Sequence, residues 1–151
     1  MRLILPDLPA TERFAARVAA LACPGDAILL SGDLGAGKTA FARAFLRAAA
    51  GDPALEVPSP SFTLVQTYET ARGRVHHYDL WRLDGPSAPD GPSALTELGW
   101  DDASDDIVLV EWPDRLGHLT PAEALNLTFV LDEGEARVVT IDGWSGRLVD
   151  P

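Results

Sequence analysis

The sequence has 151 residues, of which 46% are hydrophobic and 23% charged, and this length favours one compact domain with its own hydrophobic core. Its 12 basic residues stand against 23 acidic ones, which gives a formal net charge of −11. Such a charge argues against unaided binding to nucleic acid or to an anionic membrane surface, because both need clustered Lys and Arg side chains. Any role on nucleic acid would therefore pass through a partner.

The first half of the chain predicts two strands that alternate with two helices. A short apolar run is typical of a strand, and the apolar side chains that then recur every three or four residues predict an amphipathic helix. The four consecutive apolar residues AILL are typical of a strand buried on both faces. The predicted elements are a strand at 3–5, a helix at 11–22, a strand at 27–30 and, after a glycine-rich loop, a helix that Gly51 ends.

The glycine-rich loop fits the phosphate-binding pattern G-x-x-x-x-G-K-[ST] from Gly32 to Thr39. Glycines let successive backbone N–H groups point at phosphates, and the following helix adds its own N–H groups and positive dipole end. Lys38, the only lysine of the chain, would reach the β- and γ-phosphates, and the Thr39 hydroxyl would bind Mg²⁺. A glycine-rich turn that matches by chance is the alternative, but the flanking strand and helix disfavour it. The predicted nucleotide contacts are Gly32, Asp33, Leu34, Gly35, Ala36, Gly37, Lys38, Thr39 and Ala40.

The second half of the chain predicts further strands around one surface loop. Two strands, SFTLVQTY and RVHHYDL, join in a hairpin across residues 70–73, and a later pair joins across Glu133-Gly134. The segment GPSAPDGPS is rich in Pro, Gly and Ser, which predicts a mobile surface loop. The remaining elements are that loop at 85–93, a helical turn at 95–99, an apolar strand at 107–110, an alternating strand at 125–131 and its partner at 137–141.

These elements predict one α/β domain at 1–151, a P-loop NTPase fold with a mixed, mostly parallel central sheet flanked by helices and extended by β-hairpins. Residues 143–151 match no element and are expected to form a flexible tail. Cys23 is the only cysteine, which excludes an internal disulfide and argues against a cysteine-based metal site. Because no segment approaches the roughly 20 apolar residues that span a bilayer, and the start shows no leader pattern, we expect a soluble cytoplasmic protein.

Two acids at strand ends are candidates for the hydrolysis of a bound nucleotide. Glu111 follows IVLV, the arrangement of four apolar residues and a carboxylate that a Walker B strand shows, and Asp79 ends VHHYD. The carboxyl ends of parallel strands lie beside the phosphate-binding loop in open α/β sheets, so we predict that both acids are catalytic. Ordinary strand-end acids on the surface are the alternative interpretation.

Two further groups of side chains leave their roles open. The segment SPSF at 59–62 supplies hydroxyls where other P-loop proteins keep a switch that senses the γ-phosphate, but a capped turn explains it equally well. His76 and His77 have no evident third ligand, which argues against a zinc site. Side chains alternate along a strand, so His77 could face the same side as Asp79.

Four motifs follow one another in a distinctive order and spacing: GDLGAGKTAF, SPSFTLV, HYDLWRL and VEWP. Together they resemble the TsaE (YjeE) family, small bacterial P-loop ATPases needed to make threonylcarbamoyladenosine beside the anticodon of tRNAs, and the resemblance covers nearly the whole chain. It implies ATP and Mg²⁺ as cofactors, with nucleotide contacts at 35–39. It further implies Mg²⁺ ligands at Thr39 and Glu111, and acids for hydrolysis at Asp79 and Glu111.

The resemblance also implies partners. Family members dock on a pair of proteins, TsaD and TsaB, in which TsaD carries the transfer chemistry, and ATP hydrolysis resets the complex between turnovers. Because the partner would hold the tRNA, an acidic chain is compatible with this role, and we expect no tight direct binding of tRNA. The sequence offers no obvious arginine beside the loop, so hydrolysis by the isolated chain is expected to be weak.

Two other classes of function remain open. A small-molecule or nucleoside kinase uses the same loop to transfer the γ-phosphate to an acceptor. Such kinases usually carry several cations on a lid, whereas only Arg72, Arg74 and Arg82 lie in mid-chain here. A nucleotide-dependent binding module with negligible turnover needs no acid at a strand end, so Glu111 argues against it.

Overall fold

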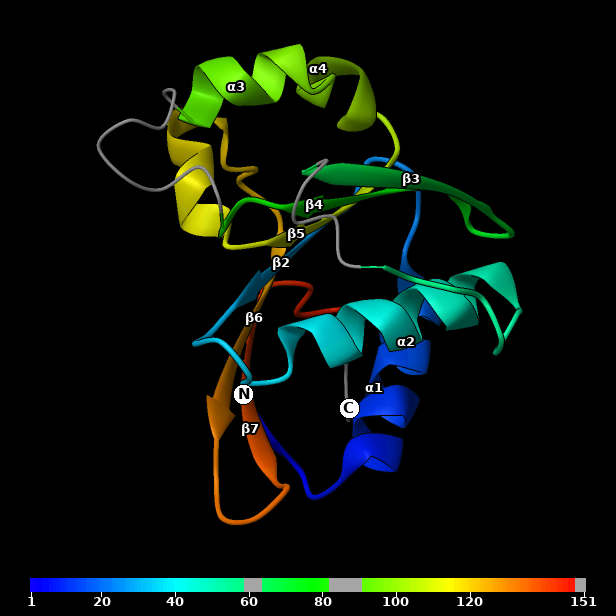
Figure 1. The fold of residues 1–151 in the computed structure, drawn as a ribbon, viewed down its shortest axis with the longest axis vertical. Helices are drawn as coiled ribbons and strands as arrows, with labels where there is room; N and C mark the ends of the chain where they lie inside the picture. The colour runs from blue at the N-terminus through cyan, green and yellow to red at the C-terminus, as the bar shows by residue number, and fades with distance from the viewer. Residues whose placement is uncertain (59–63, 82–90, 149–151) are drawn as a thin grey trace.

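The computed structural model describes residues 1–58, 64–81 and 91–148, and these residues form a seven-stranded sheet with helices around it (Figure 1). The strand order is β1-β7-β6-β2-β5-β4-β3. The strands are β1 (Arg2–Leu5), β2 (Ala27–Ser31), β3 (Val65–Thr70), β4 (Gly73–Asp79), β5 (Ile107–Glu111), β6 (Leu125–Leu131) and β7 (Arg137–Asp142).

The sheet has a parallel centre and antiparallel edges. β6, β2, β5 and β4 pair in parallel, whereas β7 and β1 extend the sheet beyond β6 through antiparallel pairs, and β3 pairs antiparallel with β4. All of these strands except β3 and β7 therefore point in the same direction, which confirms the predicted mixed, mostly parallel sheet of an α/β fold. Both predicted hairpins, β3–β4 and β6–β7, are present.

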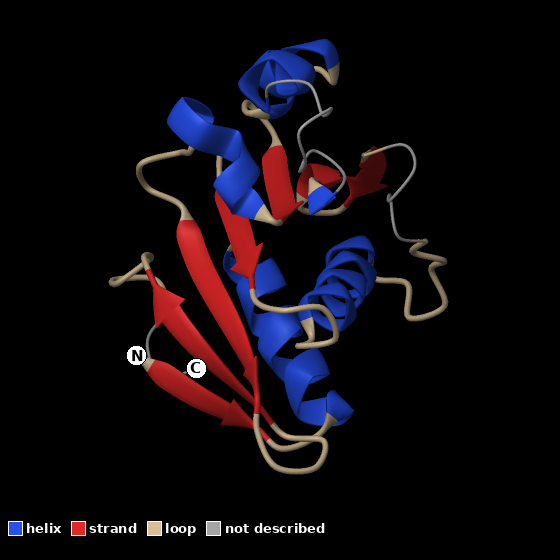
Figure 2. Cartoon of the chain, turned by 60° about the vertical axis from the view of Figure 1, so that its left-hand side comes forward, coloured by secondary structure: helices blue, strands red, loops and turns tan. Residues whose placement is uncertain are grey.

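Helices cover both faces of the sheet (Figure 2). One layer consists of α1 and α2, and the opposite layer consists of α3, α4 and the 3-10 helix η2. None of the helices in the described ranges is long and apolar enough to cross a bilayer. The helices are α1 (Leu8–Leu21), α2 (Lys38–Ala50), α3 (Gly91–Glu97), α4 (Trp100–Ala103) and η2 (Pro113–Leu119).

Each layer has its own hydrophobic core, because successive strand residues point to opposite faces. On β2, Ile28 and Leu30 join the core beneath α1 and α2. Ala27 and Leu29 join the core beneath α3, α4 and η2. Two buried faces explain why the sequence AILL is apolar at every position, and they fix the strand that leads into the glycine-rich loop.

The first helix begins at Leu8, earlier than the predicted residue 11. The Asp7 side chain caps it by accepting a hydrogen bond of 2.9 Å from the Ala10 N–H. A proline is tolerated in this first turn, because its missing N–H would have no partner in the helix. The second helix ends as predicted: Gly51 lies in the left-handed region at φ 67° and caps α2.

Two predictions of irregular chain are wrong in part. A loop was expected at 85–93, but residues 91–93 form the first turn of α3, and residues 85–90 lie outside the described ranges. The helical turn expected at 95–99 belongs to the same helix as far as Glu97. A flexible tail was expected at 143–151, but Trp144 and Leu148 are 8% and 2% exposed and belong to the core beneath α1 and α2. Residues 149–151 are not described.

Candidate active site

The glycine-rich loop joins the end of β2 to the start of α2. Gly32 (φ 139°) and Gly37 (φ 119°) both adopt the left-handed backbone that other residues rarely tolerate. A Cβ on Gly32 would lie 2.5 Å from the carbonyl oxygen of Phe129, so glycine alone lets the loop approach β6 this closely. Because α2 begins at Lys38, the unpaired N–H groups of its first turn lie beside the loop.

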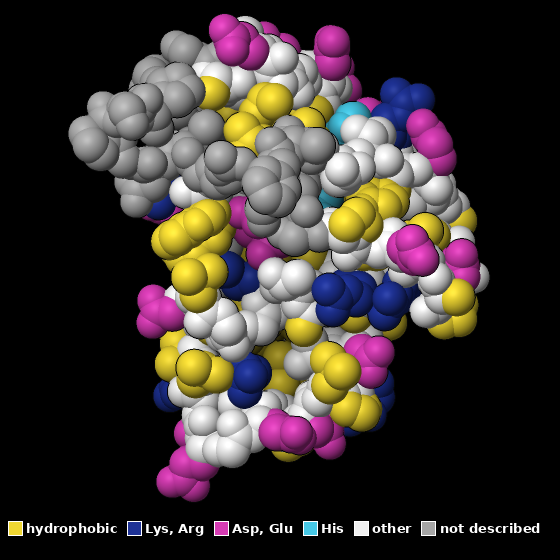
Figure 3. Space-filling view, viewed as in Figure 1, with side chains coloured by type: hydrophobic (Ala, Val, Ile, Leu, Met, Phe, Trp, Pro, Cys, Tyr) yellow, Lys and Arg dark blue, Asp and Glu magenta, His cyan; other side chains and the backbone are white. Residues whose placement is uncertain are grey.

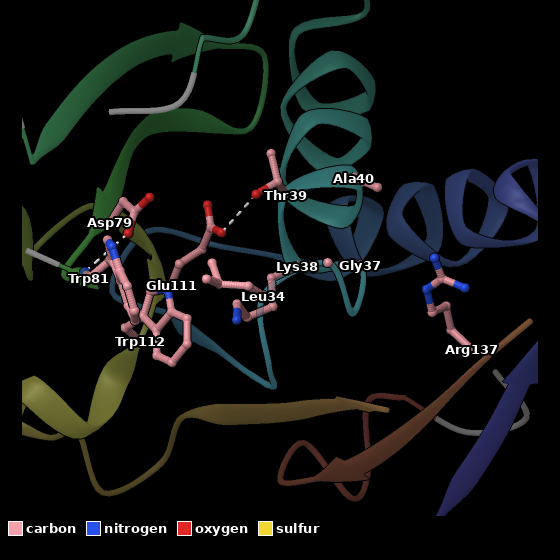
Figure 4. A pocket seen from close by; sticks show the side chains of 11 residues that line it. Leu34, Gly37, Lys38, Thr39, Ala40, Asp79, Trp81, Glu111, Trp112 and Arg137 are labelled. Carbon is pink, nitrogen blue, oxygen red and sulfur yellow. Dashed lines mark hydrogen bonds between the residues drawn. The ribbon is translucent and has the colours of Figure 1, made fainter. Parts of the chain in front are cut away.

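A cleft of about 430 Å³ opens between this loop and the carboxyl ends of β4 and β5 (Figure 4). Most of the predicted nucleotide contacts line it, and so do both predicted acids. Gly32, Asp33 and Ala36 do not line it, and Ala36 is buried in the core. The lining residues are Leu34, Gly35, Gly37, Lys38, Thr39, Ala40, Asp79, Trp81, Glu111, Trp112 and Arg137.

Lys38 is folded back onto its own loop and is only 4% exposed. Its ammonium donates to the carbonyl oxygens of Gly32 and Asp33, and it lies 3.7 Å from the centre of the Trp112 ring. Burial lowers the pKa of Lys38, and the nearby Glu111 carboxylate opposes this shift. The side chain is thus a buried cation whose partners are carbonyl dipoles and an aromatic face.

The two predicted acids lie side by side, since Asp79 and Glu111 are register partners at the ends of β4 and β5. Glu111 is 2% exposed, and its Oε1 accepts a hydrogen bond of 3.1 Å from the Thr39 hydroxyl, drawn as a dashed line in Figure 4. Its Oε2 lies 2.7 Å from Nε2 of His77. Asp79 is 7% exposed and accepts a hydrogen bond from the Trp81 N–H at 3.2 Å.

The hydroxyl of Thr39 and the carboxylate of Glu111 suit a hard divalent cation. Both present oxygen atoms, the ligand type that Mg²⁺ prefers, and the two groups already meet at hydrogen-bond distance. No cluster of three or more His, Cys, Asp or Glu side chains in the described residues could hold a metal ion unaided. This donor set fits Mg²⁺ completed by phosphate oxygens and water, which is how P-loop proteins usually bind it.

Three residues that line the cleft are not among those that the sequence predicts for the site. Trp81 and Trp112 pack against each other with ring centres 4.8 Å apart, and Trp112 adopts a left-handed backbone at φ 62° directly after Glu111. The motif VEWP could have indicated Trp112 through its position. Arg137 reaches the cleft from β7, on the far side of Gly37 from Glu111 (Figure 4). The position of Arg137 at the cleft depends on how the strands pair, and no local sequence pattern indicates it.

The hydroxyl-rich segment at 59–62, for which the sequence leaves a switch and a capped turn open, lies outside the described residues.

The loop, the helix that follows it and the two strand-end acids together form a known type of site. A buried parallel strand leads through a glycine-rich loop into a helix that begins with Lys38 and Thr39, and acids end the two neighbouring strands on one side. These features define the class of P-loop proteins.

Comparison with known proteins gives the family within this class. The family model "Threonylcarbamoyl adenosine biosynthesis protein TsaE" matches residues 5–139. The chain therefore belongs to the TsaE family, whose members take part in the biosynthesis of threonylcarbamoyladenosine in tRNA.

Individual relatives agree with this assignment. The chain is 38% identical over 136 residues to the tRNA threonylcarbamoyladenosine biosynthesis protein TsaE of Rickettsia felis, covering 88% of this chain and 75% of the relative. It is 31% identical over 139 residues to the protein of the same name from Bacillus subtilis, with coverages of 91% and 82%. The crystal structure of YdiB from Bacillus subtilis superposes with a TM-score of 0.71 at 26% identity, covering 93% of this chain and 83% of that one.

Proposed function

We propose that this chain binds ATP with Mg²⁺ and hydrolyses it as a component of the tRNA threonylcarbamoyladenosine machinery, acting on the TsaD–TsaB pair of proteins. The observation that carries this proposal is the convergence of Lys38, Thr39, Asp79 and Glu111 on one cleft. Family membership supports the pathway. The activity and the partners are inferred from the chemistry of the site and from the family resemblance.

Phosphate binding follows from the loop and the start of α2. The backbone N–H groups there can surround a phosphate without a Cβ in the way. Lys38 is the only lysine, and it now donates to neutral carbonyl oxygens of the loop. Phosphate oxygens are stronger acceptors for an ammonium than neutral carbonyls are, so the side chain would exchange these partners for the β- and γ-phosphates of a nucleotide.

The two acids would divide the work of hydrolysis. Glu111 already accepts a hydrogen bond from the Thr39 hydroxyl, which supports its assignment as the metal ligand beside Thr39. Thr39 and Glu111 would hold Mg²⁺, whose charge would offset the negative charge that develops on the phosphate. Asp79 lies beside Glu111 at the cleft wall and keeps slightly more exposure, so it is the better placed of the two to accept a proton from an attacking water.

Partner dependence follows from the cations at the cleft. Within the described residues, the Lys and Arg side chains that line it are Lys38 and Arg137, and Figure 4 shows Arg137 on the opposite side of Gly37 from Glu111. Neither side chain places an arginine beside Asp79 and Glu111. P-loop enzymes that lack such an arginine hydrolyse their nucleotide slowly until a partner provides one. Figure 3 shows basic side chains interspersed with acidic and apolar ones on one face, which does not favour direct tRNA binding there.

Capture of the purified TsaD–TsaB pair by this chain tests the proposal. We expect capture that depends on ATP and Mg²⁺, and that is lost in Lys38→Ala because that variant loses its only phosphate-directed lysine. A gel shift with the isolated chain at physiological salt should show no appreciable tRNA binding. Equal capture with and without ATP, or strong tRNA binding in the absence of the TsaD–TsaB pair, would contradict the proposal. Loss of ATP that requires an added nucleoside would indicate a kinase instead.

A further inference from the structure

His77 is a buried polar side chain that the proposed chemistry leaves without a role. It is 1% exposed and does not line the cleft. It lies on β4 two residues before Asp79, and its register partner on β5 is Leu109, two residues before Glu111. Residues two apart in a strand share a face, so the imidazole lies on the same face of the sheet as both acids.

The imidazole and the Thr39 hydroxyl hold different oxygens of one carboxylate. Nε2 of His77 lies 2.7 Å from Oε2 of Glu111, and the Thr39 hydroxyl lies 3.1 Å from Oε1. Both His77 and Glu111 are nearly inaccessible to water, at 1% and 2% exposure. One oxygen of the acid is therefore fixed inside the protein, and the other faces the start of α2.

Hydrogen-bond satisfaction identifies the donor in this pair. Nδ1 of His77 is buried and has no hydrogen-bond partner within the described residues. A buried N–H without an acceptor is costly, so the ring proton belongs on Nε2, where it can be donated to Oε2 of Glu111. The imidazole therefore donates to Glu111 through Nε2.

We infer that His77 is a positioning residue for the metal-binding acid. Its Nε2–H holds Oε2 of Glu111, so that Oε1 is directed toward Thr39 and remains available to Mg²⁺. The inference rests on the proposed function, because it assigns His77 a task in the same site. Residues that orient a metal ligand through its second oxygen typically change metal affinity or activity by about 10- to 100-fold when they are removed.

Two substitutions separate this role from mere packing. His77→Leu removes the donor and keeps an apolar side chain in the core, whereas His77→Gln places an amide N–H near the position of Nε2. We measure binding of a fluorescent ADP analogue against Mg²⁺ concentration. In His77→Leu we expect unchanged affinity without metal and about a 10-fold higher Mg²⁺ requirement. ATP turnover should fall with little change in KM, and His77→Gln should restore most of both properties.

His76 provides a matched control. It is the adjacent histidine on the same strand, but its ring lies between Thr67 and Asp106, at 3.0 and 2.8 Å, away from Glu111. His76→Leu should leave the Mg²⁺ requirement unchanged. A second control uses Glu111→Gln as a background: because His77 acts through this acid, adding His77→Leu there should not raise the Mg²⁺ requirement further.

The outcomes distinguish this inference from the proposed function. If the wild-type protein binds nucleotide no better with Mg²⁺ than without it, both are overturned. If wild-type binding depends on Mg²⁺ and folded His77→Leu shows the same dependence, the inference alone is overturned. It is also overturned if His77→Gln raises the Mg²⁺ requirement and lowers turnover as much as His77→Leu does. Should His77→Leu fail to fold, His77→Asn replaces it, since its shorter amide cannot reach Oε2. Equal behaviour of the Asn and Gln variants would then refute the role.

Discussion

Replacing Glu111 by Gln separates nucleotide binding from hydrolysis, because the substitution keeps the shape of the side chain and removes its charge. The amide can remain within the existing hydrogen bonds, because its oxygen can accept from Nε2–H of His77 and its NH₂ group can donate to a rotated Thr39 hydroxyl. Hydrogen bonds to a charged group are stronger than those to a neutral one, so we expect a loss of roughly 1–2 kcal/mol in the free energy of unfolding. The variant should therefore fold.

The loss in activity should be much larger than the loss in stability. Without the carboxylate, the site keeps the Thr39 hydroxyl but has no charge to hold Mg²⁺ or polarise water beside it. We expect turnover to fall about 100-fold or more, which corresponds to roughly 2.7 kcal/mol of transition-state stabilisation. The assay is phosphate release at saturating ATP and Mg²⁺, with the affinity for ADP without metal measured in parallel. Turnover near the wild-type value would refute the reasoning and leave Asp79 as the principal acid.

Three further predictions concern the loop and the core. Lys38→Ala should lower ATP affinity about 10- to 100-fold in calorimetric titration of the folded variant, and near-normal affinity would exclude its phosphate role. Gly32→Ala should lower the free energy of unfolding by about 2 kcal/mol or more in denaturant unfolding, because the new Cβ would clash with the Phe129 carbonyl. Gly35→Ala should cost about 1 kcal/mol, because a Cβ there has no atom within 4 Å and only the left-handed backbone is strained. Burial raises the pKa of Tyr78 to about 12, so the free energy of unfolding should fall as pH rises from about 10 toward that value. Tyrosine ionisation, followed by absorbance, should accompany unfolding, and a Tyr78 phenol that titrates near 10 in the folded protein would contradict this prediction.

The parts of the fold that rest on local patterns could be predicted from the sequence. The alternation of buried faces in AILL, the helical spacing after Lys38 and the cap at Gly51 all follow from short-range sterics and periodicity. The glycine pattern predicted a loop between a strand and a helix, and β2 and α2 flank that loop in the structure. Asp79 and Glu111 were brought together because the ends of parallel strands meet at one edge of a sheet.

Other features depend on contacts between distant parts of the chain or on composition that favours two structures. His77 reaches Glu111 across 34 residues, and the strand pattern gives its face but not its partner. Arg137 enters the cleft only because β7 returns beside β6. The start of α3 has the Gly-Pro-Ser composition of a loop, although the first turn of a helix also accepts proline. The end of the chain lacks periodicity, and Trp144 is buried because the fold places it there.

Phosphate release from ATP, measured for the isolated chain and again with the TsaD–TsaB pair, tests the central claim most directly. The cleft contains the loop lysine and both acids but has no arginine beside them in the described residues. We therefore predict slow, Mg²⁺-dependent release by the chain alone and a rise of up to about 10³- to 10⁵-fold when the pair supplies or orders a cation, with no rise in Glu111→Gln. Fast release that the pair does not increase, or release that does not depend on Mg²⁺, would contradict the claim.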